Sequence, residues 1–105
     1  MTGIARQTDS AECDSDVHGC PLCPHKVKGI IVTGSKNVFI NGLPASRKTD
    51  KGLHAACCNG NFFEIFDGSN TVFVNGQPAA KKGSKTKHCG GSGKIVSASE
   101  NVLIN

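Results

Sequence analysis

The sequence has no tryptophan and no tyrosine, a single methionine, and only five phenylalanines to supply aromatic character. A chain of 105 residues with so few large side chains can bury only a modest core of small and β-branched residues. Thirteen glycines and four prolines indicate many tight turns. A chain of this kind usually needs a metal, a disulfide or a partner to hold it together. We expect one domain over residues 1–105.

Long apolar runs are missing as well. No stretch approaches the roughly 18 apolar residues of a membrane span, and no charged and apolar leader opens the sequence. We therefore expect a cytoplasmic protein, or one exported by a route that removes no signal peptide. No stretch shows a convincing 3.6-residue apolar period either, so we expect little helix.

The charge is only mildly positive, with a formal net value of +4. The one basic run consists of Lys81, Lys82, Lys85 and Lys87, and such runs are usually solvated faces. Because the phenylalanines are scattered and no basic helix is visible, we predict no nucleic-acid binding. A small zinc module that recognises nucleic acid through this run is kept as an alternative.

What the sequence does contain is a repeat. Residues 34–45 return as residues 68–79 with 8 of 12 positions identical, and residues 98–105 match the first copy at 5 of 8 positions. Repeats at a near-fixed period indicate a repeat architecture. The expected strands are Lys28–Thr33 and Val38–Asn41, then Phe62–Asp67 and Val72–Asn75, then Lys94–Ser97 and Val102–Asn105. Residues 10–25, 50–61 and 85–93 read as loops, and Asn41-Gly42 and Asn75-Gly76 as hairpin turns.

The third copy is incomplete. It stops at Asn105, before the segment that follows each of the other copies. The beginning of the chain supplies a similar segment, because Ala5–Asp9 resembles Ser46–Asp50. We therefore predict that the two ends of the chain lie side by side, and that three hairpins close into a ring with pseudo-threefold symmetry.

Six cysteines and four histidines make a metal the preferred explanation, since no signal peptide points to an oxidising compartment. A metal-capable side chain stands nine or ten residues before the first residue of each copy. Counting back from Gly34, Gly68 and Ala98 gives His25, Cys58 and His88. Threefold closure would bring these three together, and His18 in the longer first loop would complete a tetrahedron. Imidazoles and one thiolate are an ordinary zinc ligand set.

Counting four residues forward from Asp50, Ser84 and Asp9 gives another set, which is His54, His88 and Cys13. The two counts differ because the copies are unequally spaced, and the loop before the strand must absorb the difference. We therefore prefer Cys58, and His54 stays the alternative ligand.

The remaining cysteines have no assigned role. Cys20 and Cys23 form a CxxC pair, which in a redox protein belongs beside a helix that this sequence does not predict. A CxxC redox protein is thus a second alternative. Buried free cysteines behave as small hydrophobic residues, which is our default for Cys23 and Cys57. The oxidation states of Cys13, Cys20 and Cys89 are open.

The repeats resemble the PAAR-repeat family. The segments 41–47 and 75–81 resemble its Pro-Ala-Ala-Arg segments, and residues 18–25, 54–58 and 88–91 resemble its loops. This chain departs from the motif at Ser46, Lys81 and Ser84, where alanine, arginine and aspartate are usual.

The resemblance implies a mainly β, conical hairpin-repeat fold with a zinc-stabilised apex. It implies one structural zinc held by three histidines and one cysteine, which agrees with His18, His25, Cys58 and His88. The implied partner is the trimeric VgrG-like spike of a type VI secretion system or contractile phage, with one copy of this chain per trimer. The chain would be no enzyme, because a filled zinc shell offers no open position. It would wait in the bacterial cytoplasm, contact a target membrane transiently on firing, and travel with separate effector proteins.

Overall fold

The computed structural model describes residues 2–16, 25–54, 62–88 and 91–105. Within these ranges the chain is all β, as predicted, and holds no helix long and apolar enough to cross a membrane. In chain order the strands are β1 (Thr2–Gly3), β2 (Ser10–Asp16), β3 (His25–Ile31), β4 (Phe39–Ile40), β5 (Leu43–Pro44), β6 (Lys51–His54), β7 (Phe62–Ile65), β8 (Phe73–Val74), β9 (Gln77–Pro78), β10 (Lys85–His88), β11 (Gly91–Ile95) and β12 (Leu103–Ile104).

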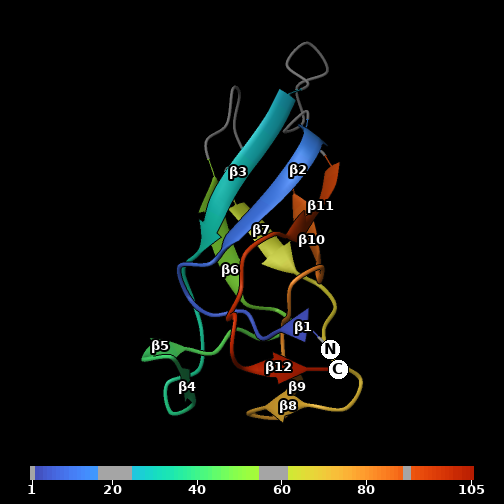
Figure 1. The fold of residues 1–105 in the computed structure, drawn as a ribbon. Coiled ribbons are helices and arrows are strands. Elements are labelled where there is room, and N and C mark those ends of the chain that lie inside the picture. Colours follow the sequence, from blue (N-terminus) through green and yellow to red (C-terminus); the bar gives the residue numbers. More distant parts are fainter. Residues whose placement is uncertain (1, 17–24, 55–61, 89–90) are drawn as a thin grey trace.

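Two bodies stack along the molecule. Six strands form a closed antiparallel barrel in the order β10-β11-β2-β3-β6-β7, made of three pairs of strands that are consecutive in the chain. The short strands form three two-stranded sheets, β4–β5, β8–β9 and β1–β12. Figure 1 shows these sheets gathered at one end of the barrel, which we call the base. Three barrel pairs and three base sheets are the predicted pseudo-threefold arrangement.

The two ends of the described chain pair with each other. Thr2 lies opposite Ile104 and Gly3 opposite Leu103, so the first and last strands form one base sheet. The Ile4 amide then donates to the Val102 carbonyl at 3.0 Å. Figure 1 shows the N and C labels next to each other. The prediction that the start of the chain completes the third copy is confirmed.

Two of the base sheets end in tight hairpin turns. Asn41 and Gly42 join β4 to β5 with φ angles of 55° and 80°, and Asn75 and Gly76 join β8 to β9 with 53° and 80°. Positive φ at both central residues matches the right-handed twist of the strands, and Asn-Gly is the pair that adopts it most readily. The predicted hairpin turns are confirmed.

The prediction of loops over residues 10–25, 50–61 and 85–93 was wrong for the parts that form β2, β6 and β10; residues 17–24, 55–61 and 89–90 lie outside the described residues. The second residue of each of these strands faces inward and is buried; these residues are Ala11, Gly52 and Thr86. A narrow barrel has room only for small side chains there, so these strands show no apolar alternation. β3 pairs with β2 and β6, and does not pair with β4, the next strand along the chain.

The barrel interior mixes threefold and asymmetric packing. Ile31, Ile65 and Ile95 occupy equivalent positions and are at most 1% exposed. The layer above them holds one aromatic ring, that of Phe63, which is directly opposite Gly52. A Cβ at Gly52 would lie 2.1 Å from the Phe63 Cζ. The threefold equivalents of Phe63 are Gly29 and Gly93, so one ring occupies a place that is glycine in the other two strand pairs.

A ring of three backbone hydrogen bonds separates the barrel core from the base core. The Ala5 amide donates to the Ala80 carbonyl at 2.8 Å, Ala80 to Ser46 at 2.9 Å, and Ser46 to Ala5 at 3.0 Å. Each residue thus donates to one neighbour and accepts from the other. All three are fully buried, and they mark the pseudo-threefold axis.

Ser46 carries the one side-chain atom among the described residues that is buried without a hydrogen-bond partner, its hydroxyl oxygen. Its equivalents Ala5 and Ala80 have only a methyl group. Burying an unpaired hydroxyl costs about 1–3 kcal/mol, so Ser46→Ala is expected to stabilise the fold by about 1 kcal/mol. Urea unfolding followed by circular dichroism measures this. Ser35→Ala is the control, because the Ser35 hydroxyl accepts from the Val38 amide at 2.9 Å and its removal should destabilise.

Candidate functional site

The barrel end away from the base is the candidate metal apex. Antiparallel order places the start of β3, β7 and β11 and the end of β2, β6 and β10 at this one end (Figure 1). His25 begins β3, and His54 and His88 end β6 and β10. Three of the four histidines therefore have their backbones at the apex, contributed by three different strands.

The other two predicted ligands, His18 and Cys58, lie outside the described residues. Among the side chains that the structure does describe, no three of the types His, Cys, Asp or Glu gather as a metal site. The donor set itself suits zinc, since imidazole nitrogen and thiolate sulfur are its usual ligands. The prediction of a zinc site at His18, His25, Cys58 and His88 stays a prediction.

Strand register relates His54 to His88. His54 lies opposite Gly29 on β3, and His88 lies opposite Phe63 on β7. Gly29 and Phe63 each precede the next turn, at Gly34 and Gly68, by five residues. The backbone of His54 therefore stands where the third pair has His88, which is the equivalence given by the forward count. Zinc retention in the His54→Ala and Cys58→Ala variants decides between the two residues.

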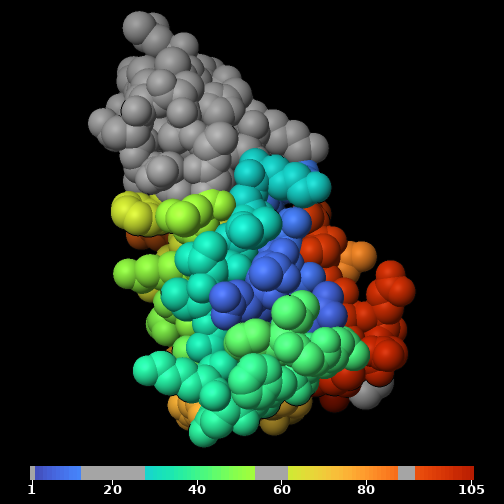
Figure 2. All heavy atoms as spheres, turned by 90° about the vertical axis from the view of Figure 1, so that its left-hand side faces the viewer, coloured from blue at the N-terminus to red at the C-terminus, as the bar shows by residue number. Residues whose placement is uncertain are grey.

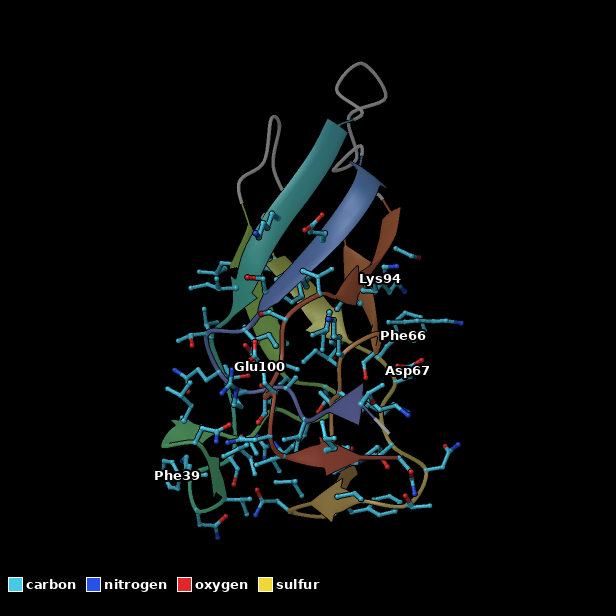
Figure 3. The ribbon with its side chains drawn as sticks, in the orientation of Figure 1. Phe39, Phe66, Asp67, Lys94 and Glu100 are labelled. Carbon is cyan, nitrogen blue, oxygen red and sulfur yellow. The ribbon has the colours of Figure 1, made fainter. Side chains whose placement is uncertain are left out.

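The base exposes one large apolar side chain on each of its three sheets. Phe39 on β4 is 56% exposed, Phe73 on β8 is 57% and Leu103 on β12 is 47%. Their neighbours along the strands, such as Val74 and Ile104, turn inward and form the base core. Figure 3 shows Phe39 at the outer edge of the base. We call Phe39, Phe73 and Leu103 the base triad.

Sequence reasoning left the partner-binding residues unassigned, although a signal for the base triad was present. The same position of each copy, directly after a valine, is Phe, Phe and Leu. Alternation along a short strand places such a residue on the face opposite its buried neighbours.

Arginine–aspartate pairs hold two of the three corners where barrel meets base. Arg47 donates from Nε to Asp50 Oδ2 at 2.9 Å and from Nη2 to Oδ1 at 3.0 Å, and its Nη1 reaches Asn75 in the next base sheet. This hydrogen bond to Asp50 raises the pKa of Arg47, an effect that burial opposes and the carboxylate charge reinforces. Arg6, Asp9 and Asn41 repeat the arrangement, and Asp9 raises the pKa of Arg6 in the same way.

The third corner exchanges its carboxylate and hydroxyl. Thr33 donates to Asp50 and accepts from the Lys51 amide in the second corner. The third corner has Ser84 in the place of Asp50, and Asp67 accepts from the next amide at 2.8 Å. Each corner therefore keeps one carboxylate and one hydroxyl. The departure at Ser84 is compensated within the chain.

The lysine run is divided between the barrel wall and the base end. Lys85 and Lys87 lie on β10, where Lys87 is opposite both Glu64 and Ser92. Lys82 is held at the base end, with its amide donating to the Gly3 carbonyl. Nothing in this placement favours the nucleic-acid alternative over the others.

Comparison with known proteins identifies one family pattern. The pattern described as the PAAR motif matches residues 2–57 and again residues 23–92, which together span most of the chain. The two matches overlap, as expected for a repeated unit. A search of curated proteins found no match.

Proposed function

Since the chain belongs to the PAAR-motif family, which is associated with the spike tip of the type VI secretion system and is structural rather than enzymatic, we propose that it caps a trimeric VgrG-like spike. One chain would sit on the blunt end of one trimer. The observation that carries this proposal is the base triad, in which one exposed apolar residue stands on each of three equivalent sheets.

Symmetry gives the stoichiometry. A closed threefold spike offers three identical surfaces, and a single chain with pseudo-threefold symmetry can match all of them at once. Each base sheet is two-stranded, and its outer backbone edge would invite uncontrolled pairing unless a partner covered it. Docking on a trimer would cover the edges and the base triad together.

We propose that zinc at the apex makes the tip rigid. His18, His25, Cys58 and His88 would hold the ion, with His54 as the alternative to Cys58. Zinc would supply folding free energy at the apex, beyond Phe63, which is the buried apolar side chain of the described core nearest to that end. A rigid apex and a spike-bound base suit a part that meets a target membrane first. The chain would be held in the bacterial cytoplasm until firing.

The test is to mix the purified chain with a trimeric VgrG-type spike and to determine the mass of the complex by native mass spectrometry. We expect one chain per trimer. Phe73→Asp is expected to weaken binding about tenfold or more, because it places a charge in an apolar contact. Ser92→Asp on the barrel wall is the matched control and should bind normally. Three chains per trimer, or equal loss with both variants, would contradict the proposal.

A further inference from the structure

The outer wall of the barrel carries three equivalent cross-strand rows, and one of them is apolar. Ile30 on β3 lies opposite Leu53 on β6, which lies opposite Phe62 on β7. Directly opposed residues point to the same face of a sheet, so these three side chains form one continuous row. They are 48%, 45% and 59% exposed. We call them the apolar row.

The same position on the other two walls is polar. The pseudo-threefold axis relates the apolar row to the row Glu64, Lys87, Ser92 and to the row Lys94, Glu12, Lys28. Figure 2 looks at the side of the barrel where β3 and β6 lie, in teal and light green. Figure 3 labels Lys94 on the opposite flank. The fold therefore accepts charged residues at this position, and barrel stability does not demand an apolar row.

The core does not use the apolar row. The inward residues beside it, Ile31, Gly52 and Phe63, already fill the barrel and are buried. The three large apolar side chains are each about half exposed, and contiguous exposed apolar patches mark interaction sites. Two rows with charged residues and one row without them indicate a binding surface used once per chain.

We propose that the apolar row binds a short segment of another protein, in which apolar anchors are flanked by carboxylates. The charges beside the row determine this choice. Lys28 precedes Ile30 by two residues and Lys51 precedes Leu53 by two, so both lie on the outer face, and both are exposed. The acidic neighbours are Glu64, which lies opposite Lys51 and Lys87, and Glu12, which lies opposite Lys28 and Lys94. Each carboxylate is thus flanked by two lysines, so positive charge is in excess around the row among the described residues.

The size of the row argues against a second copy of this chain. A stable dimer buries about 800 Å² on each partner. An aromatic side chain offers only about 150–250 Å² in full, and the members of the row are about half exposed. A short segment with two or three apolar anchor residues fits this area. We expect it to bind weakly and reversibly, as small interfaces do. This inference concerns the barrel wall and does not rest on the spike-tip function.

The probe is a synthetic 16-residue peptide designed as a helix with a leucine stripe and glutamates elsewhere, labelled for fluorescence anisotropy. We expect it to bind the full-length chain one to one, more weakly as salt rises. A second peptide with lysine at every glutamate position should bind at least tenfold more weakly. Equal binding of the two peptides, or none at millimolar protein, would overturn the proposal.

Two matched variants use the internal symmetry of the barrel. The triple variant I30E/L53K/F62S copies the row Glu64, Lys87, Ser92 onto the apolar wall, and should lose binding at least tenfold. The reverse variant E64I/K87L/S92F builds a second apolar row and should bind two peptides per chain. Leu53→Lys alone gives the same test with less change to the barrel. Circular dichroism melting checks that each variant is folded, and undiminished binding by a folded Leu53→Lys or triple variant would refute the site.

Two further measurements distinguish a protein segment from a membrane surface and from a second copy of this chain. Binding to phosphatidylglycerol vesicles that the triple variant abolishes would assign the row to a membrane surface and overturn the proposal. Concentration-dependent dimerisation in analytical ultracentrifugation, lost in the triple variant, would assign it to a second copy and also overturn it. A monomer that ignores vesicles and binds the acidic peptide supports the proposal. The triple variant should still cap a spike, so failure here is distinguishable from failure of the spike-tip function.

Discussion

His25→Ala and His88→Ala are each expected to abolish stoichiometric zinc binding and to lower the melting temperature by about 10 °C or more. Structural zinc contributes about 10–16 kcal/mol in small zinc-binding peptides, and for a domain near 100 residues each 1 kcal/mol shifts the melting temperature by about 4–8 °C. Losing even a fraction of the zinc contribution therefore gives a large shift. Elemental analysis should find about one zinc per wild-type chain, and circular dichroism melts with and without a chelator measure the loss.

The same experiment decides the fourth ligand. His18→Ala and Cys58→Ala should behave like His25→Ala, whereas His54→Ala should keep its zinc. The register makes this a demanding control, because His54 and His88 stand at equivalent backbone positions. If His54→Ala loses zinc and Cys58→Ala keeps it, the assignment moves to His54. If every variant keeps one zinc, the apex is not the metal site.

Gly52→Ala is expected to destabilise the barrel by about 3 kcal/mol, at the upper end of what overpacking usually costs. The added Cβ would stand 2.1 Å from the Phe63 Cζ and 2.4 Å from the Ile30 carbonyl oxygen. The ring cannot move away easily, since it is 1% exposed in a closed barrel. The carbonyl belongs to the backbone of a neighbouring strand. Urea unfolding of the zinc-loaded protein gives the free energy of unfolding.

Ala11 provides the matched comparison, because it is the threefold equivalent of Gly52 and already carries a Cβ in a fully buried place. Ala11→Gly should cost only about 1 kcal/mol, through the added freedom of the unfolded chain. Phe63→Leu combined with Gly52→Ala should recover part of the loss, since the shorter side chain relieves one of the two contacts. A Gly52→Ala variant as stable as wild type would show that this layer is not tightly packed.

The base and its closure could be predicted from the sequence because turn chemistry and repetition are local signals. Asn41-Gly42 specifies a hairpin, and the likeness of Ala5–Asp9 to Ser46–Asp50 places the two ends together. The barrel strands β2, β6 and β10 could not be found in this way. Apolar alternation marks strands whose inward side chains are large, whereas the described inward residues of these strands are the small Ala11, Gly52 and Thr86.

The candidate sites divide along the same line. Histidine and cysteine can be recognised as possible metal ligands from residue type alone. The candidate ligands His18, His25, Cys58 and His88 could therefore be named from the sequence. The apolar row could not be found from the sequence alone. Its members belong to three strands, and one of those strands, β6, was expected to be loop, so only the register brings them together.

Pairing β1 with β12 also determines when the molecule can finish folding. Thr2 and Ile104 are partners although they are 102 positions apart in the chain. Contacts between distant residues must overcome the entropy of closing a long loop, and they slow folding relative to local hairpins. During synthesis, the hairpins β4–β5 and β8–β9 can form as they emerge, but the third side of the base has to wait for the last strand. The ring closes in a single late step, so a partner that recognises all three sides at once would select finished molecules over nascent ones.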